Sequence, residues 1–294
     1  MNYVRYFTTD VFTTTAFAGN PLAVCPDARG LTTAQMSAIA REFNLSETVF
    51  VLPPRDPRHT RSIRIFTPAQ ELPFAGHPTI GTAIVLAACG YVSSGLDGDI
   101  EIVLEEGIGP VPVTVRMVDQ VPVFAKLTVR RHPELGPPPP DRAVVAAMLS
   151  LAPADIVAGP DAIQTVSCGV PYLFVPVVDR AAVGRVRPVG NLDGHAIFVF
   201  FQRGEQVHAR MFAPELGVVE DPATGSAVAA LGGYLADRER TNTNGTLRWV
   251  VEQGEDMGRP SRLELEVDRQ DGRVARVRVG GSAVLISEGS IRVV

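Results

Sequence analysis

Two pairs of segments in this 294-residue chain resemble each other at a nearly constant spacing. Residues 64–68 (RIFTP) match residues 210–214 (RMFAP), and residues 77–83 (HPTIGTA) match residues 221–227 (DPATGSA). The offsets are 146 and 144 residues, and the order of the segments is the same in both halves. We therefore predict a duplication that gives two similar domains, in line with a typical domain length of about 150 residues. A cleft between two such domains is a common place for a ligand site.

Each half mixes helix and strand patterns, which predicts a mixed α/β (α+β) fold. Apolar periodicity and small-residue runs predict helices at 32–43, 79–88, 141–149 and 225–235. Alternating or continuous apolar segments predict strands at 48–52, 62–66, 100–104, 111–117, 165–177, 196–201, 208–212, 262–267 and 274–279. A run of four prolines at 137–140 cannot lie inside a helix or sheet, so we expect the domain boundary within about 118–140.

The composition excludes several classes of partner. The chain has 27 basic and 32 acidic residues, a net charge of −5, whereas nucleic-acid binders usually have a basic domain or stripe. The longest strongly apolar stretch, residues 83–89, is far shorter than the ~20 residues that cross a membrane. The N-terminus lacks the basic-then-apolar layout of a signal peptide. We expect a cytoplasmic protein with no nucleic-acid or membrane partner.

The sequence also lacks the usual signs of a cofactor or metal site. Its only lysine, Lys126, lies in an alternating segment typical of a strand, which argues against Schiff-base catalysis. Cys25, Cys89 and Cys168 form no CxxC pair, and the five histidines are scattered. A Gly-rich dinucleotide motif is also missing. We therefore expect no metal and no organic cofactor.

Two loops are candidates for the chemistry. Residues 73–79 and 220–226 each lead into a predicted small-residue helix, whose first N–H groups lack intrahelical partners. Such helix ends bind carboxylates and stabilise developing negative charge, although they can also be ordinary caps. In the sequence alignment His77 and Asp221 occupy matched positions, and both residue types serve as general acids or bases.

A third segment, residues 44–50 (NLSETVF), leads from a predicted helix into a buried strand. Its carboxylate, Glu47, is either solvated at the end of that strand or held in a partly desolvated cleft. Desolvation would raise its pKa from ~4.3 toward neutrality, as a general base requires. The pattern alone leaves both interpretations open.

Six segments together resemble the PhzF-like phenazine biosynthesis isomerase family, in the order of that family and over nearly the whole chain. They are residues 17–24, 44–50, 71–81, 210–214, 220–227 and, near the end, 253–254 with 258–261. The resemblance implies a diaminopimelate epimerase-like fold: two similar domains, each a β-barrel-like sheet around a central helix, with the site between them. The implied domains are residues 1–125, joined by a returning C-terminal strand at 280–294, and residues 130–279.

The resemblance also implies an activity. The family is usually homodimeric and uses neither metal nor organic cofactor, and its named member isomerises trans-2,3-dihydro-3-hydroxyanthranilate by moving a proton between ring carbons. The implied catalytic residues are Glu47, which takes and returns the proton, and His77, Asp221 and Ser226, which bind the substrate and assist. Gly76 and Gly225 would supply backbone N–H groups, and Asn20, Ser46 and Thr224 would contact the substrate.

Three functions follow from these observations. The first is a cofactor-independent isomerase that shifts a proton between carbons of a small carboxylate. The second is an epimerase or racemase of a small amino or hydroxy acid in the same fold. The absence of cysteine from the candidate loops disfavours the two-thiol form of that reaction. The third is a non-catalytic small-anion binding protein, which the four intact candidate catalytic residues disfavour.

Overall fold

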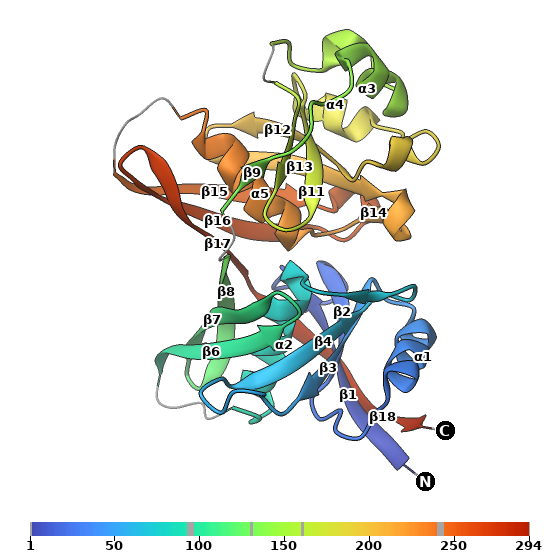
Figure 1. Cartoon of the computed structure of the whole chain (residues 1–294), viewed down its shortest axis with the longest axis vertical. Helices are drawn as coiled ribbons and strands as arrows, with labels where there is room; N and C mark the ends of the chain where they lie inside the picture. Colours follow the sequence, from blue (N-terminus) through green and yellow to red (C-terminus); the bar gives the residue numbers. More distant parts are fainter. Residues whose placement is uncertain (1, 93–96, 130–131, 160–161, 240–243, 294) are drawn as a thin grey trace. The chain divides into compact units, whose positions relative to one another are not determined.

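Two small-residue segments of the sequence form helices that are buried on nearly every side. They are α2 (Gly76–Ala88), in which every residue but the last is buried, and α5 (Gly225–Ala236), in which every residue but one is buried. A helix that is apolar all round must be enclosed by other elements. In this computed structural model each helix is enclosed by its own curved set of strands (Figure 1).

The structure describes residues 2–92, 97–129, 132–159, 162–239 and 244–293. The chain divides into two units: unit 1 is residues 1–128 with 280–294, and unit 2 is residues 129–279. Residue 130, where the second predicted domain begins, lies outside the described residues. The proline run at 137–140 lies within unit 2.

In its described residues, unit 1 contains α2, the outer helix α1 (Thr33–Phe43) and nine strands. The strands are β1 (Asn2–Val11), β2 (Asn20–Cys25), β3 (Glu47–Leu52), β4 (Arg61–Phe66), β5 (Glu71–Leu72), β6 (Gly98–Glu106), β7 (Gly109–Val118), β8 (Val121–Val129) and β18 (Ala283–Val293).

The described part of unit 2 contains α5, the outer helices α3 (Arg142–Met148) and α4 (Arg180–Arg185), and nine strands. The strands are β9 (Glu134–Leu135), β10 (Gln164–Ser167), β11 (Pro171–Pro176), β12 (Ile197–Arg203), β13 (Gln206–Ala213), β14 (Val218–Asp221), β15 (Gly245–Gln253), β16 (Ser261–Gln270) and β17 (Arg273–Gly281). Short 3-10 turns lie at Pro153–Asp155, Leu192–Gly194, Pro214–Leu216 and Glu255–Met257.

The predicted duplication is present in the strand pairing. In unit 1, β2 is parallel to β3, β3 is antiparallel to β4, and β4 pairs with β5 and, in parallel, with β6. In unit 2, β11 is parallel to β12, β12 is antiparallel to β13, and β13 pairs with β14 and, in parallel, with β15. The registers agree as well. Thr48 of β3 pairs with Phe66 of β4 in unit 1, and Ile197 of β12 pairs with Phe212 of β13 in unit 2.

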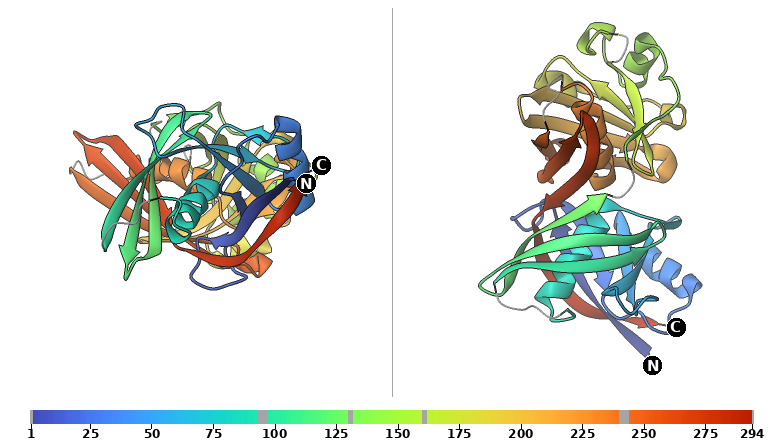
Figure 2. Two further views of the ribbon diagram at one scale, coloured as in Figure 1. Left: turned by 90° about the horizontal axis from the view of Figure 1, so that it is seen from below. Right: turned by 60° about the vertical axis from the view of Figure 1, so that its left-hand side comes forward.

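The C-terminal strand β18 returns to unit 1, which is otherwise formed by the first 128 residues. β18 pairs along the whole of β1, from Asn2 opposite Val293 to Val11 opposite Ala283, and the two strands run side by side in both views of Figure 2. β9 pairs in the same way, antiparallel, with β10. The N- and C-terminal strands are therefore fixed to each other within unit 1.

Two predicted elements have different bounds in the structure. The strand predicted at 165–177 is two strands, β10 and β11, because the chain turns at Gly169 with a φ of 125°. The helix predicted at 79–88 begins three residues earlier, at Gly76. Pro78 is tolerated there because the first turn of a helix has no use for its missing N–H.

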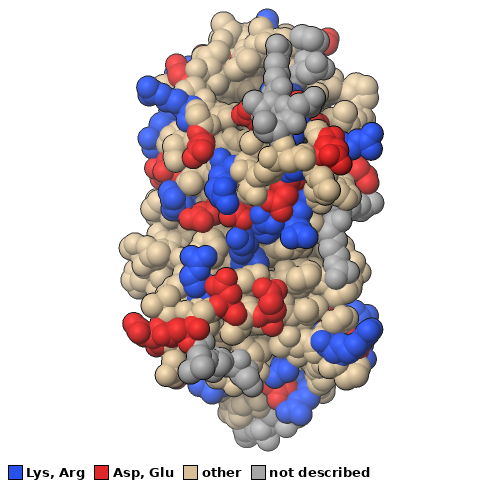
Figure 3. Space-filling view, turned by 90° about the vertical axis from the view of Figure 1, so that its left-hand side faces the viewer, with Lys and Arg blue, Asp and Glu red and all other residues tan. Residues whose placement is uncertain are grey.

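The surface of each unit mixes both signs of charge. On the face shown in Figure 3, arginine and lysine side chains alternate with aspartate and glutamate side chains over short distances. Among the described residues, every helix is too short or too polar to cross a membrane.

Candidate active site

A helix end and a tight turn bring Glu47 to the start of β3. Helix α1 starts with a capping box, in which Thr32 and Gln35 each accept from the other's backbone N–H. It ends at Asn44, whose φ of 51° is left-handed and reverses the chain. Asparagine tolerates this conformation better than most residues. Glu47 then opens β3, paired with Leu22 of the parallel strand β2.

His77, the second residue of α2, faces this carboxylate. Its Nε2 lies 3.3 Å from Oε2 of Glu47, and the two side chains are 4% and 13% exposed. Burial lowers the pKa of His77 to about 3, so the imidazole is neutral at physiological pH. The sequence left open whether Glu47 is solvated or enclosed, and the structure shows it largely enclosed.

The tautomer of His77 follows from its other hydrogen bond. The ring hydrogen-bonds the backbone of Pro21, and since proline has no N–H, the ring donates to the Pro21 carbonyl. Nε2 has no hydrogen-bond partner among the described residues, so Nδ1 is the donor. A lone pair on Nε2 therefore points toward the Glu47 carboxyl group, an arrangement that can hold a single proton between the two side chains.

The start of α2 completes what we call the α2 site: Asn20, Ser46, Glu47, Gly76 and His77. The N-cap residue Ala75 offers no side-chain cap, and the N–H groups of Gly76 and His77 are too early in the helix to have intrahelical partners. Asn20 is fully buried at the first position of β2, and Ser46 is half-buried directly before Glu47. The site combines an acid–base pair with a positive helix end.

In unit 2 a buried hydrogen-bond network fixes the loop before α5. Thr224 donates through Oγ1 to Oδ2 of Asp221 at 2.6 Å. Gln253 donates through Nε2 to the backbone oxygen of Asp221 at 2.7 Å, and its Oε1 accepts from the N–H of Thr224 at 3.2 Å. All three side chains are buried, so the orientation of the Gly225 N–H at the helix start is determined by this network.

Ser226, the second residue of α5, contacts a tyrosine. Its Oγ lies 2.7 Å from the hydroxyl of Tyr172, which is on β11 and is 4% exposed. With the network above, this contact forms what we call the α5 site: Tyr172, Asp221, Thr224, Gly225, Ser226 and Gln253. The site has hydroxyl and amide groups around a second positive helix end.

The sequence alignment that matched His77 with Asp221 is wrong. In unit 1 Leu72 pairs with Ile65, and at the equivalent place in unit 2 Asp221 pairs with Met211. Three residues lie between Leu72 and the start of α2, and three lie between Asp221 and the start of α5. Asp221 is thus equivalent to Leu72, and His77 is equivalent to Ser226. From Met211 to its partner Asp221 the β13–β14 hairpin spans three residues more than the β4–β5 hairpin spans from Ile65 to its partner Leu72, and its register shifts between Met211 and Ala213. This difference displaced the alignment.

Two residues of the α5 site were not predicted as site residues. Tyr172 lies in an apolar strand, where a tyrosine is usually part of the core, and only its need for a hydroxyl partner could have drawn attention to it. Gln253 lies in a motif that resembles the family, but the resemblance assigns it no role. Its partners come from a loop about thirty residues away, and only the fold shows this.

The cysteines lie elsewhere in the fold. Burial raises the pKa of Cys25, at the end of β2, to about 12, so its thiol is not a nucleophile at neutral pH. Cys89 ends α2, at the opposite end of the helix from His77, and Cys168 is in the turn after β10. Within the ranges that the structure describes, no three His, Cys, Asp or Glu side chains are arranged to bind a metal ion.

Comparison with known proteins gives the family. The family model described as phenazine biosynthesis-like protein matches residues 9–289. The chain belongs to the phenazine biosynthesis-like family. An uncharacterized isomerase of Mesorhizobium japonicum is 43% identical, covering 99% of this chain and 98% of that protein. Trans-2,3-dihydro-3-hydroxyanthranilate isomerase of Pseudomonas aeruginosa is 35% identical, covering 97% of this chain and 98% of that enzyme.

Solved structures agree with this assignment. A family member from Bacillus anthracis superposes over all of both chains with a TM-score of 0.87 at 24% identity. A predicted epimerase of Pseudomonas aeruginosa superposes with a TM-score of 0.81 at 33% identity, over 99% of this chain and all of that one. A probable proline racemase from Agrobacterium radiobacter reaches 0.64 at 14% identity. The predicted fold class is therefore confirmed: members of this family share the mixed α+β fold of the epimerases and racemases.

Proposed function

We propose that this protein is a cofactor-independent isomerase that shifts a proton between two carbons of a small carboxylate. The observation that supports it best is the enclosed Glu47–His77 pair, with 3.3 Å between the two side chains, at the start of α2. The names of the relatives, among them an isomerase 35% identical in sequence, support the same reaction class.

Glu47 acts as the acid–base group. Its carboxylate takes a proton from one carbon of the substrate, negative charge develops on the conjugated system, and the same carboxyl group returns the proton to a second carbon. No other atom is gained or lost. His77 is neutral, so it does not stabilise the carboxylate as a cation would.

The two helix starts bind negative charge. We propose that the N–H groups of Gly76 and His77 stabilise the charge that develops during proton transfer. The N–H groups of Gly225 and Ser226, in a loop fixed by Asp221, Thr224 and Gln253, would bind a carboxylate. Asn20 and Ser46 would contact the substrate beside Glu47.

Epimerisation is the second candidate, supported by the similarity to the predicted epimerase of Pseudomonas aeruginosa that is 33% identical. Two-base epimerases need an acid–base group on each face of one carbon. The position equivalent to Glu47 in unit 2 is Ala196, directly before Ile197, so the duplication does not repeat the carboxylate. This favours a single acid–base group and therefore proton transfer between carbons.

A substrate screen in D2O tests the proposal. Small unsaturated cyclic and acyclic carboxylates, including trans-2,3-dihydro-3-hydroxyanthranilate, are incubated with protein that has been dialysed against a chelator, and the products are analysed by NMR and mass spectrometry. We expect a shifted double bond with deuterium at one new carbon. Inversion at a carbon with no shift of a double bond would establish an epimerase, and binding without any exchange would establish an anion-binding protein.

A further inference from the structure

A buried glutamate that the proposed mechanism does not use lies beneath the start of α2. Glu106 ends β6, is 2% exposed, and accepts a hydrogen bond from the backbone N–H of Ala75, the N-cap residue of α2. Its Oε1 lies 2.6 Å from Oγ1 of Thr79, in the first turns of the same helix. The side chain thus contacts the helix on both sides of Gly76 and His77.

The two contacts of the Thr79 hydroxyl group indicate the protonation state of Glu106. Thr79 Oγ1 lies 2.7 Å from the backbone oxygen of Ala75 and 2.6 Å from Oε1 of Glu106. A hydroxyl group has one proton to donate, and a carbonyl oxygen can only accept. Both contacts are hydrogen bonds only when Thr79 donates to Ala75 and a protonated Glu106 donates to Thr79.

The duplicated unit places a neutral side chain at the same position. In unit 1 Ser62 of β4 pairs with Glu105, and in unit 2 His208 of β13 pairs with Glu252. The residues that follow, Glu106 and Gln253, are therefore equivalent. Gln253 accepts from the N–H of the N-cap residue Thr224 and donates through Nε2 to the Thr224 hydroxyl at 3.1 Å. A protonated glutamate offers the same acceptor and donor as this amide, and an ionised one does not.

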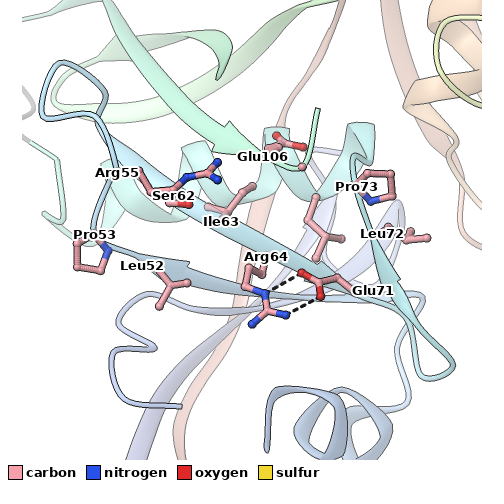
Figure 4. A pocket seen from close by; sticks show the side chains of 12 residues that line it. Leu52, Pro53, Arg55, Ser62, Ile63, Arg64, Glu71, Leu72, Pro73 and Glu106 are labelled. Carbon is pink, nitrogen blue, oxygen red and sulfur yellow. Dashed lines mark hydrogen bonds and ion pairs between the residues drawn. The ribbon is translucent and has the colours of Figure 1, made fainter. Parts of the chain in front are cut away.

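The charged side chains around Glu106 form ion pairs with one another. Arg55, Arg64 and Glu71 line the same pocket of about 560 Å³, where Figure 4 shows Glu106 across from the ion pair between Arg64 and Glu71. Arg55 is paired with Glu105, whose carboxylate also accepts from the N–H groups of Arg55 and Asp56 and lies 2.8 Å from His59.

The remaining titratable group on α2 is His77, which is neutral. Burial accordingly raises the pKa of Glu106 to about 8. At neutral pH the protonated form therefore predominates.

We propose that Glu106 is a positioning residue that holds a proton in the working enzyme and so keeps the start of α2 in place while leaving its positive end to the substrate. When Glu106 loses this proton, the single proton of the Thr79 hydroxyl can serve only one of its two acceptors, the Ala75 carbonyl or the Glu106 carboxylate, so one of the two hydrogen bonds is lost. The negative charge then lies beside the N–H groups that the proposed function assigns to the substrate. The inference rests on the proposed function for the role of those N–H groups, but the protonation of Glu106 can be measured without a substrate.

The direct experiment is an NMR titration of the backbone amides of Ala75, Gly76 and Thr79 between pH 6 and 9.5. In the wild type we expect these three signals to shift together with a midpoint near pH 8, and in Glu106→Gln to stay constant. The matched variant Gln253→Glu should introduce the same titration at Thr224 and Gly225. Identical titration of the α2 amides in wild type and Glu106→Gln would overturn the proposal.

Stability and activity provide two further readouts. The pKa of Glu106 is raised above its ordinary value of 4.5, so the folded state binds more protons than the unfolded state, and stability should fall as pH rises from about 4.5 to 8. Glu106→Gln should lessen this fall. With an active substrate, wild-type turnover should fall about tenfold per pH unit above the midpoint, and Glu106→Gln should keep its neutral-pH turnover.

The outcomes separate the two proposals. Titrating amides in a protein that shows no turnover would contradict the proposed isomerase and leave the protonated Glu106 established. Turnover whose alkaline limb is unchanged in Glu106→Gln would contradict the positioning role. Glu106→Ala distinguishes positioning from simple loss of the residue, because it should weaken turnover at every pH, whereas glutamine should restore it.

Discussion

The starts of α2 and α5 have the same architecture and different chemistry. Each follows a short strand and a three-residue loop, and each has its N-cap N–H bound by a side chain at the end of the following strand. The second residue of each helix faces a polar side chain: His77 faces Glu47, whereas Ser226 faces Tyr172. The two helix starts therefore share one frame, and the Glu47–His77 pair at the start of α2 corresponds to the Tyr172–Ser226 hydroxyl pair at the start of α5.

The largest effect should come from removing the acid–base group. Glu47→Gln is nearly isosteric, so the fold and the binding of a substrate should persist within a few-fold. Turnover should fall by at least the ~10²–10⁴ that general acid–base catalysis supplies. Steady-state kinetics and calorimetry measure the two quantities, and Glu42→Gln, at an exposed position on α1, is the control. Near wild-type turnover would place the acid–base chemistry in the α5 site instead.

The pH dependence of stability distinguishes His77 from an exposed histidine. Its pKa is lowered from 6.5 to about 3, so between these values the unfolded state binds more protons and stability should rise with pH. The contribution is at most about 1.4 kcal/mol per pH unit. Urea unfolding from pH 4 to 7 should show a shallower rise in His77→Gln and an unchanged rise in His132→Gln, at an exposed position. Parallel curves for all three proteins would mean that His77 binds the same number of protons in the folded and unfolded states, which would contradict the lowered pKa.

The glycines that follow Glu106 and Gln253, Gly107 and Gly254, both lie against the loop before the central helix of their unit. A Cβ at Gly254, where φ is 80°, would lie 2.4 Å from the Arg259 oxygen and 2.6 Å from the Pro222 oxygen. We expect Gly254→Ala to cost about 3 kcal/mol of stability. Gly258→Ala, with a similar φ of 70° and no atom within 4 Å of its Cβ, should cost about 1 kcal/mol.

Gly107 is the equivalent of Gly254 in unit 1, and its φ is not positive. A Cβ at Gly107 would lie 2.7 Å from the Cα of Pro73. Gly107→Ala should therefore lie between the other two variants in chemical denaturation. No loss in Gly107→Ala, together with equal losses in Gly254→Ala and Gly258→Ala, would show that backbone strain, and not contact with the loop proline, sets the cost.

The smallest effect should come from the hydroxyl pair of the α5 site. Tyr172→Phe removes the partner of Ser226 and should cost about 1 kcal/mol of stability, with a correspondingly modest loss of substrate affinity. Tyr3→Phe, at an exposed tyrosine, should change neither. A loss of turnover as large as that of Glu47→Gln would assign Tyr172 a direct part in proton transfer.

Local patterns predicted much of this molecule. Apolar periodicity gave the central helices and most strands, and the matched segments gave the duplication, because both depend on residues close together in sequence. The equivalence of His77 with Asp221 failed because Met211 and its partner Asp221 are three residues further apart in sequence than Ile65 and its partner Leu72. This difference changes the alignment without changing the two motifs that flank it.

The partners of buried polar groups could not be predicted. Glu106 and Gln253 stand at the ends of strands β6 and β15, where a polar residue normally indicates solvent. Their contacts with the N-cap residues exist only because each strand lies in parallel beside β4 or β13 and so ends next to the helix start. The 3.3 Å separation of Glu47 and His77 likewise depends on the pairing of β2 with β3.

Proton exchange measured at the substrate itself tests the central claim most directly. A substrate bound in D2O under single-turnover conditions should acquire deuterium in the wild type and in Ser226→Ala, and should acquire none above the uncatalysed rate in Glu47→Gln, although calorimetry shows it bound. Deuterium incorporation by Glu47→Gln at the wild-type rate would contradict the account, because the proton would then be moved by a group other than the carboxylate that faces His77.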